Sequence, residues 1–254
     1  MRGFFLALAL TGLAGSSLVR ADGLLIPTDH ALPPLSLTYE RVKVTIVGQV
    51  ATTTVHQSYR NRTGRDLEAE YIFPLPAGAS VRDFSMWVGG KRYVGEAVEA
   101  RKARQTYEDI VRRLQDPGLL EYIGRDLWKA RIYPVPRGSE QEMEITFTTI
   151  LPLEAGMISY QYLLRNGQTV RKTVRDFTVV VQIQSDDPLG PIYSPSHGIS
   201  VDRRGDREAV VSFEQNARTL DKDFQLYFVP KAARIGVSML TQTSVFLTAT
   251  RNSD

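Results

Sequence analysis

Apolar and polar residues alternate along most of this chain, which is the pattern of β-strands that bury one face. Val42, Val44 and Ile46 share one side of such a run, and the apolar phase shifts beyond Gly48. That shift predicts a bulge or a bend between two strand segments. Further strand-like runs follow at residues 67–73, 84–88, 127–135, 142–151, 158–164, 177–184, 209–213, 224–229 and 244–250. The sequence therefore predicts a mainly β protein.

One segment breaks the alternation and has helical spacing. Its apolar residues recur at steps of three and four, at Ala97, Ala100, Ala103, Tyr107, Ile110, Val111 and Leu114. Charged residues fill the intervening positions, which is typical of an amphipathic helix, and Asp116-Pro117-Gly118 would end it. Upstream, Gly89-Gly90 predicts a tight hairpin because both glycines accept positive φ. The predicted fold is an antiparallel β-sandwich-like module with one packed helix and a second β-rich segment after it.

The first 21 residues have the features of a signal peptide. Arg2 precedes an apolar stretch at residues 4–13, and Val19-Arg20-Ala21 suits a signal peptidase, so cleavage is expected after Ala21. An uncleaved anchor is the alternative, but small residues dilute the apolar run before it is long enough to span a bilayer. The expected mature chain, residues 22–254, is secreted or held in the periplasm or cell envelope, with no membrane span. It begins with a proline-containing linker or N-terminal arm at residues 22–35.

Composition narrows the possible functions. The chain of 254 residues is 43% hydrophobic and contains no cysteine, so core burial alone must stabilise the exported fold. The formal charge is +3, and loss of Arg2 and Arg20 with the leader would reduce it by two. Acidic residues interleave with the basic residues of segment 97–114. A nucleic-acid partner is therefore not expected.

A search for catalytic or metal-binding motifs is negative. The histidines stand apart at His30, His56 and His197, and nucleophile-elbow, dinucleotide-binding and Walker motifs are absent. His56 occupies an alternating strand position, which favours an exposed or hydrogen-bonded strand histidine. The carboxylate pairs Asp186-Asp187 and Glu140/Glu142 lie in turn or strand contexts. No catalytic, cofactor-binding or metal-ligating residues are predicted, no cofactor is expected, and an enzyme is disfavoured.

Asn61-Arg62-Thr63 forms an N-glycosylation sequon. It matters only in a source that makes N-linked glycans, and the sequence leaves its use open.

Several separated blocks resemble the VIT domain (vault protein inter-alpha-trypsin domain). They are GQVATTTVHQSYRN at residues 48–61, EAEYIFPLP at residues 68–76, FSMWVGG at residues 84–90, and the helical segment with Ala103 and Tyr107-Glu108. The resemblance extends over residues 36–164 and implies a β-rich module with one packed helix. It also implies kinship with exported inter-alpha-trypsin heavy chains.

In secreted relatives of this kind, a von Willebrand factor type A domain usually follows, and its metal site begins with Asp-x-Ser-x-Ser. The nearest match here, residues 83–87, ends in Trp87 and reads as a strand face. The chain is therefore expected to lack that domain, as a truncated relative or a separate partner of it. Residues 165–254 are predicted to be a β-rich connecting segment.

Two functions remain open. The first is an exported, non-catalytic protein-interaction scaffold whose partner is a protein, with a von Willebrand factor type A domain as the candidate that the resemblance favours. The second is an extracellular carbohydrate-binding β-sandwich that uses Trp87 or Trp128 as a platform. An exposed ring beside Tyr93 or Tyr133 on a flat sheet would favour carbohydrate, whereas buried rings would favour the scaffold.

Overall fold

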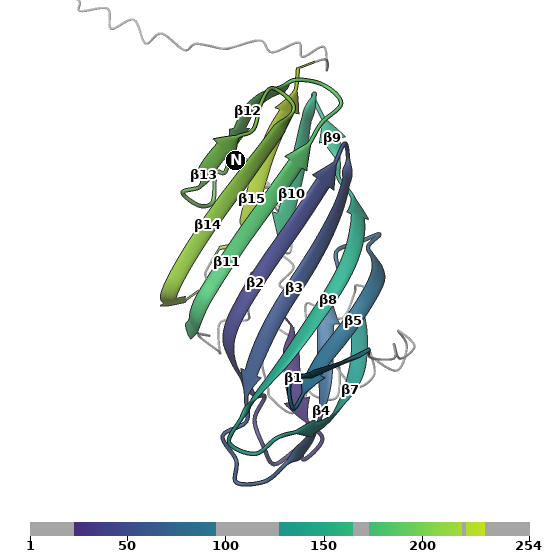
Figure 1. The fold of residues 1–254 in the computed structure, drawn as a ribbon, viewed down its shortest axis with the longest axis vertical. Helices are drawn as coiled ribbons and strands as arrows, with labels where there is room; N and C mark the ends of the chain where they lie inside the picture. The colour runs from purple at the N-terminus through teal and green to yellow at the C-terminus, as the bar shows by residue number, and fades with distance from the viewer. Residues whose placement is uncertain (1–22, 95–126, 165–172, 220–221, 232–254) are drawn as a thin grey trace, which may run out of the picture.

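The computed structural model describes residues 23–94, 127–164, 173–219 and 222–231, and within them it contains fifteen strands in three sheets. The largest sheet crosses the front of the molecule in Figure 1, and the two smaller sheets lie behind it. Its strands, in spatial order, are β13 (Ser200–Arg203), β14 (Glu208–Thr219), β11 (Thr173–Gln184), β2 (Ser36–Val47), β3 (Val50–Arg60), β8 (Glu140–Ile150), β5 (Ser80–Val88) and β6 (Lys91–Val94).

The two smaller sheets cover different parts of the large one. The three-stranded sheet consists of β1 (Leu24–Pro27), β4 (Leu67–Pro74) and β7 (Leu127–Val135), in the order β1-β4-β7. The four-stranded sheet has the order β12-β15-β10-β9, with bounds β12 (Leu189–Tyr193), β15 (Phe224–Pro230), β10 (Met157–Tyr162) and β9 (Leu153–Glu154). One continuous apolar core joins all three sheets, as expected for sheets packed face to face.

Aromatic side chains fill the space between the large sheet and its covers. Phe84 of β5 lies 4.3 Å from Trp128 of β7 between ring centroids, and Phe147 of β8 lies 5.9 Å from Phe73 of β4. Under the four-stranded sheet, the Tyr160 hydroxyl of β10 lies 3.2 Å from the Thr53 hydroxyl of β3. Both smaller sheets are thus packed on the same inner face.

The predicted hairpin at Gly89-Gly90 is confirmed. β5 and β6 pair antiparallel on either side of these two glycines, whose φ angles are +58° and +78°. The phase shift at Gly48 has a different basis from the predicted bulge or bend, because it is the turn of the β2–β3 hairpin, with φ of +58° at Gly48. In both turns a side chain at the positive φ would be strained.

The predicted fold class was wrong in its packed helix. The described residues form strands and turns, no helix packs on their sheets, and residues 97–114 lie outside the described residues. Helical periodicity is a local property, whereas a packed helix also needs an uncovered apolar sheet face. Here the inner face of the large sheet is already covered by two other sheets.

The large sheet is also mixed rather than wholly antiparallel. β11 runs parallel to β2 over nine residue pairs, from Asp176 opposite Tyr39 to Gln184 opposite Val47. Strands from before and after residue 164, where the region predicted to resemble a known domain ends, therefore share one sheet. In the same way, β15 pairs with β10. Near the N-terminus, residues 24–27 form an edge strand on β4.

Candidate interaction surface

The outer face of the large sheet carries three rings that the sequence places far apart. On β3, Val55 and Gln57 point into the core and are fully buried, so His56 between them points outward. Tyr39 of β2 and Trp87 of β5 lie on the same face. We call Tyr39, His56 and Trp87 the ring cluster.

The ring cluster is continuous across the sheet. The His56 ring is 5.3 Å from the Tyr39 ring in an edge-to-face arrangement, and it is 5.3 Å from the Trp87 ring at an interplanar angle of 47°. His56 Nε2 also lies 3.4 Å from the Tyr39 hydroxyl and 3.3 Å from Oε2 of Glu142. Such tilted contacts are the favoured geometries of neighbouring rings.

Arginine side chains flank the cluster at both ends. The Arg41 guanidinium carbon lies 4.7 Å from the Tyr39 ring centroid, and that of Arg92 lies 5.9 Å from the Trp87 centroid. Arg92 also pairs with Asp83 at 2.6 Å. Exposed ion pairs contribute little stability individually, so this pair is expected to add little to the stability of the fold.

The surroundings of Tyr39 favour its protonated form. Burial raises the pKa of Tyr39, and the nearby Glu142 carboxylate raises it further. Tyr39 therefore stays protonated over the physiological range and serves as a hydrogen-bond donor rather than a base. The arrangement offers planar rings, two cations and carboxylates to a binding partner.

The tryptophans do not form the carbohydrate platform that was weighed from the sequence. Trp128 is buried in the core, and Trp87 is half-buried in the ring cluster. Tyr93 is exposed, but it follows Arg92, the residue paired with Trp87, and so points to the opposite face of β6. Tyr133 is exposed five residues beyond Trp128 on β7. Neither tryptophan has an exposed tyrosine beside it on a flat face.

The three histidines have different surroundings in the fold. His56 is confirmed as a hydrogen-bonded strand residue. His197 packs on Phe213 at 4.4 Å between ring centroids, and His30 lies in an exposed turn. Within the described ranges, no group of three His, Asp or Glu side chains is arranged to hold a metal ion.

The sequon asparagine is a structural residue. Asn61 is fully buried, and its Nδ2 donates hydrogen bonds to the backbone carbonyls of Arg65 and Val135, each at 3.0 Å. Its Oδ1 accepts from the backbone N–H of Thr63 at 2.9 Å and from the Thr63 hydroxyl at 2.7 Å. The atom that glycosylation would modify is therefore occupied within the fold.

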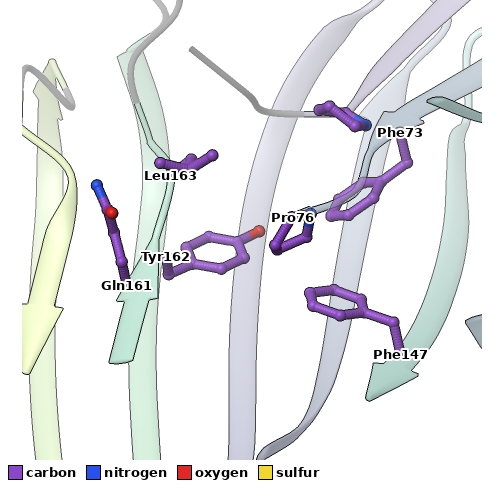
Figure 2. Close-up of a pocket in the computed structure, with 7 residues that line it drawn as sticks. Phe73, Pro76, Phe147, Gln161, Tyr162 and Leu163 are labelled. Atoms are coloured by element: carbon purple, nitrogen blue, oxygen red, sulfur yellow. The ribbon is translucent and has the colours of Figure 1, made fainter. Parts of the chain in front are cut away.

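A small apolar pocket lies where the two covering sheets meet above the large sheet. In Figure 2, Phe73, Pro76 and Phe147 approach it from one side and Tyr162 from the other. It has room for about one water molecule. The pocket is thus a packing defect between sheets rather than a substrate site.

Sequence reasoning identified Trp87 and His56 separately but missed the ring cluster. The three rings come from strands 17 to 48 positions apart, and only the pairing of β2 with β3, β3 with β8 and β8 with β5 brings them together. Outward-facing rings at strand positions were the available signal. No helix in the described part of the chain is long and apolar enough to cross a membrane.

The described residues thus form three packed β-sheets, the largest of which carries rings and arginines on its outer face. Residues 37–147 match the family model of the vault protein inter-alpha-trypsin (VIT) domain.

Curated relatives include three different kinds of protein. The human protein mono-ADP-ribosyltransferase PARP4 is 27% identical over 84% of this chain and 13% of its own length. The human von Willebrand factor A domain-containing protein 5A is 31% identical over 48% of this chain and 16% of its own length. The bovine inter-alpha-trypsin inhibitor heavy chain H3 is 25% identical over 79% of this chain and 23% of its own length. The matches thus span less than a quarter of each of these relatives.

Among solved structures, a proposed nutrient-binding protein from Legionella pneumophila superposes with a TM-score of 0.52. The match covers 83% of this chain and 71% of that one at 14% sequence identity. At this identity the similarity concerns the fold alone.

Proposed function

We propose that this protein is an exported, non-catalytic scaffold that binds another protein through the ring cluster on the outer face of its large sheet. The observation that carries the proposal is the combination of Trp, Tyr and Arg side chains in one contiguous surface. These residue types dominate the binding energy of protein interfaces. Because the rings already pack on one another, little side-chain freedom remains to be lost on binding.

A von Willebrand factor type A domain is the partner that we propose. VIT-family relatives include a protein named for that domain, and an inter-alpha-trypsin heavy chain matches 79% of the present chain. Export is supported by the leader-like residues 1–21. N-terminal sequencing of the cell-derived protein is expected to give Asp22 as the first residue, and an intact Met1 or a start elsewhere would count against export by this route.

The interaction is tested by calorimetry with the full chain and the isolated A domain of human von Willebrand factor A domain-containing protein 5A. We expect a Kd of about 10⁻⁶ to 10⁻⁵ M, as for transient complexes of standard size. Trp87→Ala and Arg92→Ala are each expected to weaken binding at least about tenfold, as truncation of an interface anchor does.

Thr45→Ala is the matched control, because Thr45 is exposed on the same face of β2 but outside the ring cluster. It should leave the Kd within about twofold of that of the unaltered chain. Thermal melts of each variant separate loss of binding from loss of folding. Absence of binding at 100-fold higher concentration, or equal binding by the Trp87→Ala chain, would contradict the proposal.

A further inference from the structure

The outer face of the large sheet carries an exposed apolar patch at the end where β2 turns into β3 and β8 ends. Val47, Val50 and Ile150 are successive cross-strand partners on β2, β3 and β8, so their side chains stand side by side on the outer face. Ile150 is 79% exposed, and Val47 and Val50 are also exposed. Leu153, likewise exposed, follows Ile150 where the chain passes into β9. We call these four residues the tip patch.

The tip patch departs from the pattern of the strands that carry it. Outward positions elsewhere on these strands are polar, for example Lys43, Thr54 and Glu144. Only the outward residue next to the tip is a large aliphatic side chain: the last residue of β2 (Val47), the first of β3 (Val50) and the last of β8 (Ile150). Val47 and Val50 are 55% and 45% exposed beside Ile150, and a contiguous exposed apolar surface commonly marks a contact site.

The chain leaves the described region at the same end of the molecule. The N–H of Gly48, in the β2–β3 turn beside the patch, donates to the carbonyl of Gln184 at 3.0 Å. Four residues further on, the carbonyl of Pro188 accepts from the N–H of Lys231 at 2.8 Å. The path from Gly48 to Lys231 thus consists of two hydrogen bonds and the four residues from Gln184 to Pro188, which span at most about 3.3 to 3.6 Å each. Lys231, the last described residue, therefore lies within about 20 Å of the turn beside the patch. Figure 1 shows the end of β15 and the β2–β3 turn at the upper end of the molecule.

The sequence beyond Lys231 contains an apolar segment that needs cover. Residues 235–250 carry no charged side chain, and within them residues 244–250, SVFLTAT, have a strand-like composition with Val245, Phe246 and Leu247 adjacent. The 13 residues from Lys231 to Ser244 reach about 40 Å when extended, twice the separation that must be bridged. A tether of this length gives a millimolar effective concentration at the patch.

We infer that residues 244–250 dock on the tip patch of the same molecule, with Phe246 against Ile150. The apolar segment and the apolar patch then cover one another, at a site distinct from the ring cluster and independent of any partner bound there. The patch is in this view an internal docking site for the chain that follows the sheets.

The absence of cysteine makes this contact directly measurable, because two introduced thiols are the only ones in the full chain. The test pair is Ile150→Cys with Phe246→Cys. The matched control is Val94→Cys with Phe246→Cys, since Val94 is 71% exposed on β6 of the same sheet. Disulfide formation is followed in a glutathione buffer by mass spectrometry of unreduced peptides, with gel electrophoresis to detect linked dimers.

Docking predicts an intramolecular disulfide in the test pair at least tenfold faster than in the control pair. Equal rates in the two pairs would overturn the inference, because they would mean that residue 246 samples the surface without preference. Linked dimers of the test pair that increase with protein concentration would also overturn it and assign the patch to a second copy. In the cysteine-free chain, Val50→Asp should accelerate trypsin cleavage after Arg251 relative to Val94→Asp, and equal cleavage would contradict docking.

Discussion

Replacement of Asn61 by alanine tests a buried polar side chain that takes part in four hydrogen bonds. Asn61 follows β3 and joins it to the turn at Thr63 and Arg65 and to the end of β7 at Val135. Its backbone N–H also donates to the carbonyl of Ser139 at 2.9 Å. Alanine keeps this backbone hydrogen bond, so the substitution removes only the bonds of the side chain.

The magnitude follows from which groups lose their partner. The Val135 carbonyl contact is buried, so this oxygen loses a donor without access to water, at a cost of about 1 to 3 kcal/mol. The Arg65 carbonyl and the Thr63 N–H lie nearer to solvent, and each loses about 1 kcal/mol of net hydrogen bonding. Asn61→Ala should therefore lower the free energy of unfolding by about 3 to 5 kcal/mol and the Tm by about 10 °C.

Urea denaturation followed by tryptophan fluorescence gives the measurement, since Trp128 is buried next to Phe84 and reports on the core. Arg62→Ala is the control within the same sequon, because Arg62 is exposed; it should change stability by less than about 0.5 kcal/mol. Asn61→Asp should destabilise at least as strongly as alanine, because a carboxylate oxygen would then face the two carbonyls. An Asn61→Ala chain within about 1 kcal/mol of the unaltered protein would refute this reasoning.

Four further outcomes are expected. Expression in a host that makes N-linked glycans should give folded protein without a glycan on Asn61, because its Nδ2 is buried and donates both hydrogens; peptide mass spectrometry that finds a stoichiometric glycan on protein of unaltered Tm would show that the placement of Asn61 is wrong. Lys129→Met should cost about 3 to 5 kcal/mol in thermal melts by removing the ammonium that lies 2.5 Å from the largely buried Glu70 carboxylate, whereas the double variant with Glu70→Leu should recover most of that loss. The hydrogen bond from the Ala31 N–H and the neighbouring Arg65 lower the pKa of Asp29 in the folded state. The unaltered protein should therefore be more stable than Asp29→Asn, with the whole difference present above about pH 5 and lost as the pH falls below 3.8 towards the folded-state pKa. Calorimetric titration with Mg²⁺, Ca²⁺ or Zn²⁺ should show no site tighter than about 10⁻⁵ M, and a tighter one would point to metal-dependent adhesion.

Much of the β architecture follows from local pattern. Alternation at Val42, Val44 and Ile46 predicts a half-buried strand, and these residues are core residues of β2. The Gly89-Gly90 hairpin is predicted from the conformational freedom of glycine alone. Such features are set within a few residues, because backbone preference and side-chain alternation act over that distance.

The same local rules fail where a residue's environment comes from distant strands. The helical spacing of residues 97–114 contains no information on whether a sheet face is left open for a helix. In the described part of the chain, the sheets cover one another. The parallel pairing of β11 with β2 is equally invisible locally, since it joins residues more than 130 positions apart. Long-range pairing depends on which apolar faces remain open after the other strands have packed.

The alternating strands, the Gly89-Gly90 turn, the lack of thiol chemistry and the VIT resemblance follow from the sequence, because each depends on residue type and short spacing. The folded chain was needed to show that Tyr39, His56 and Trp87 form one surface and that the sequon residue Asn61 is sealed inside the fold. It was also needed to place Val47, Val50 and Ile150 in an exposed patch near the end of β15. The physical reason is the strand register, since a one-residue slip would turn each of these strand side chains to the opposite face.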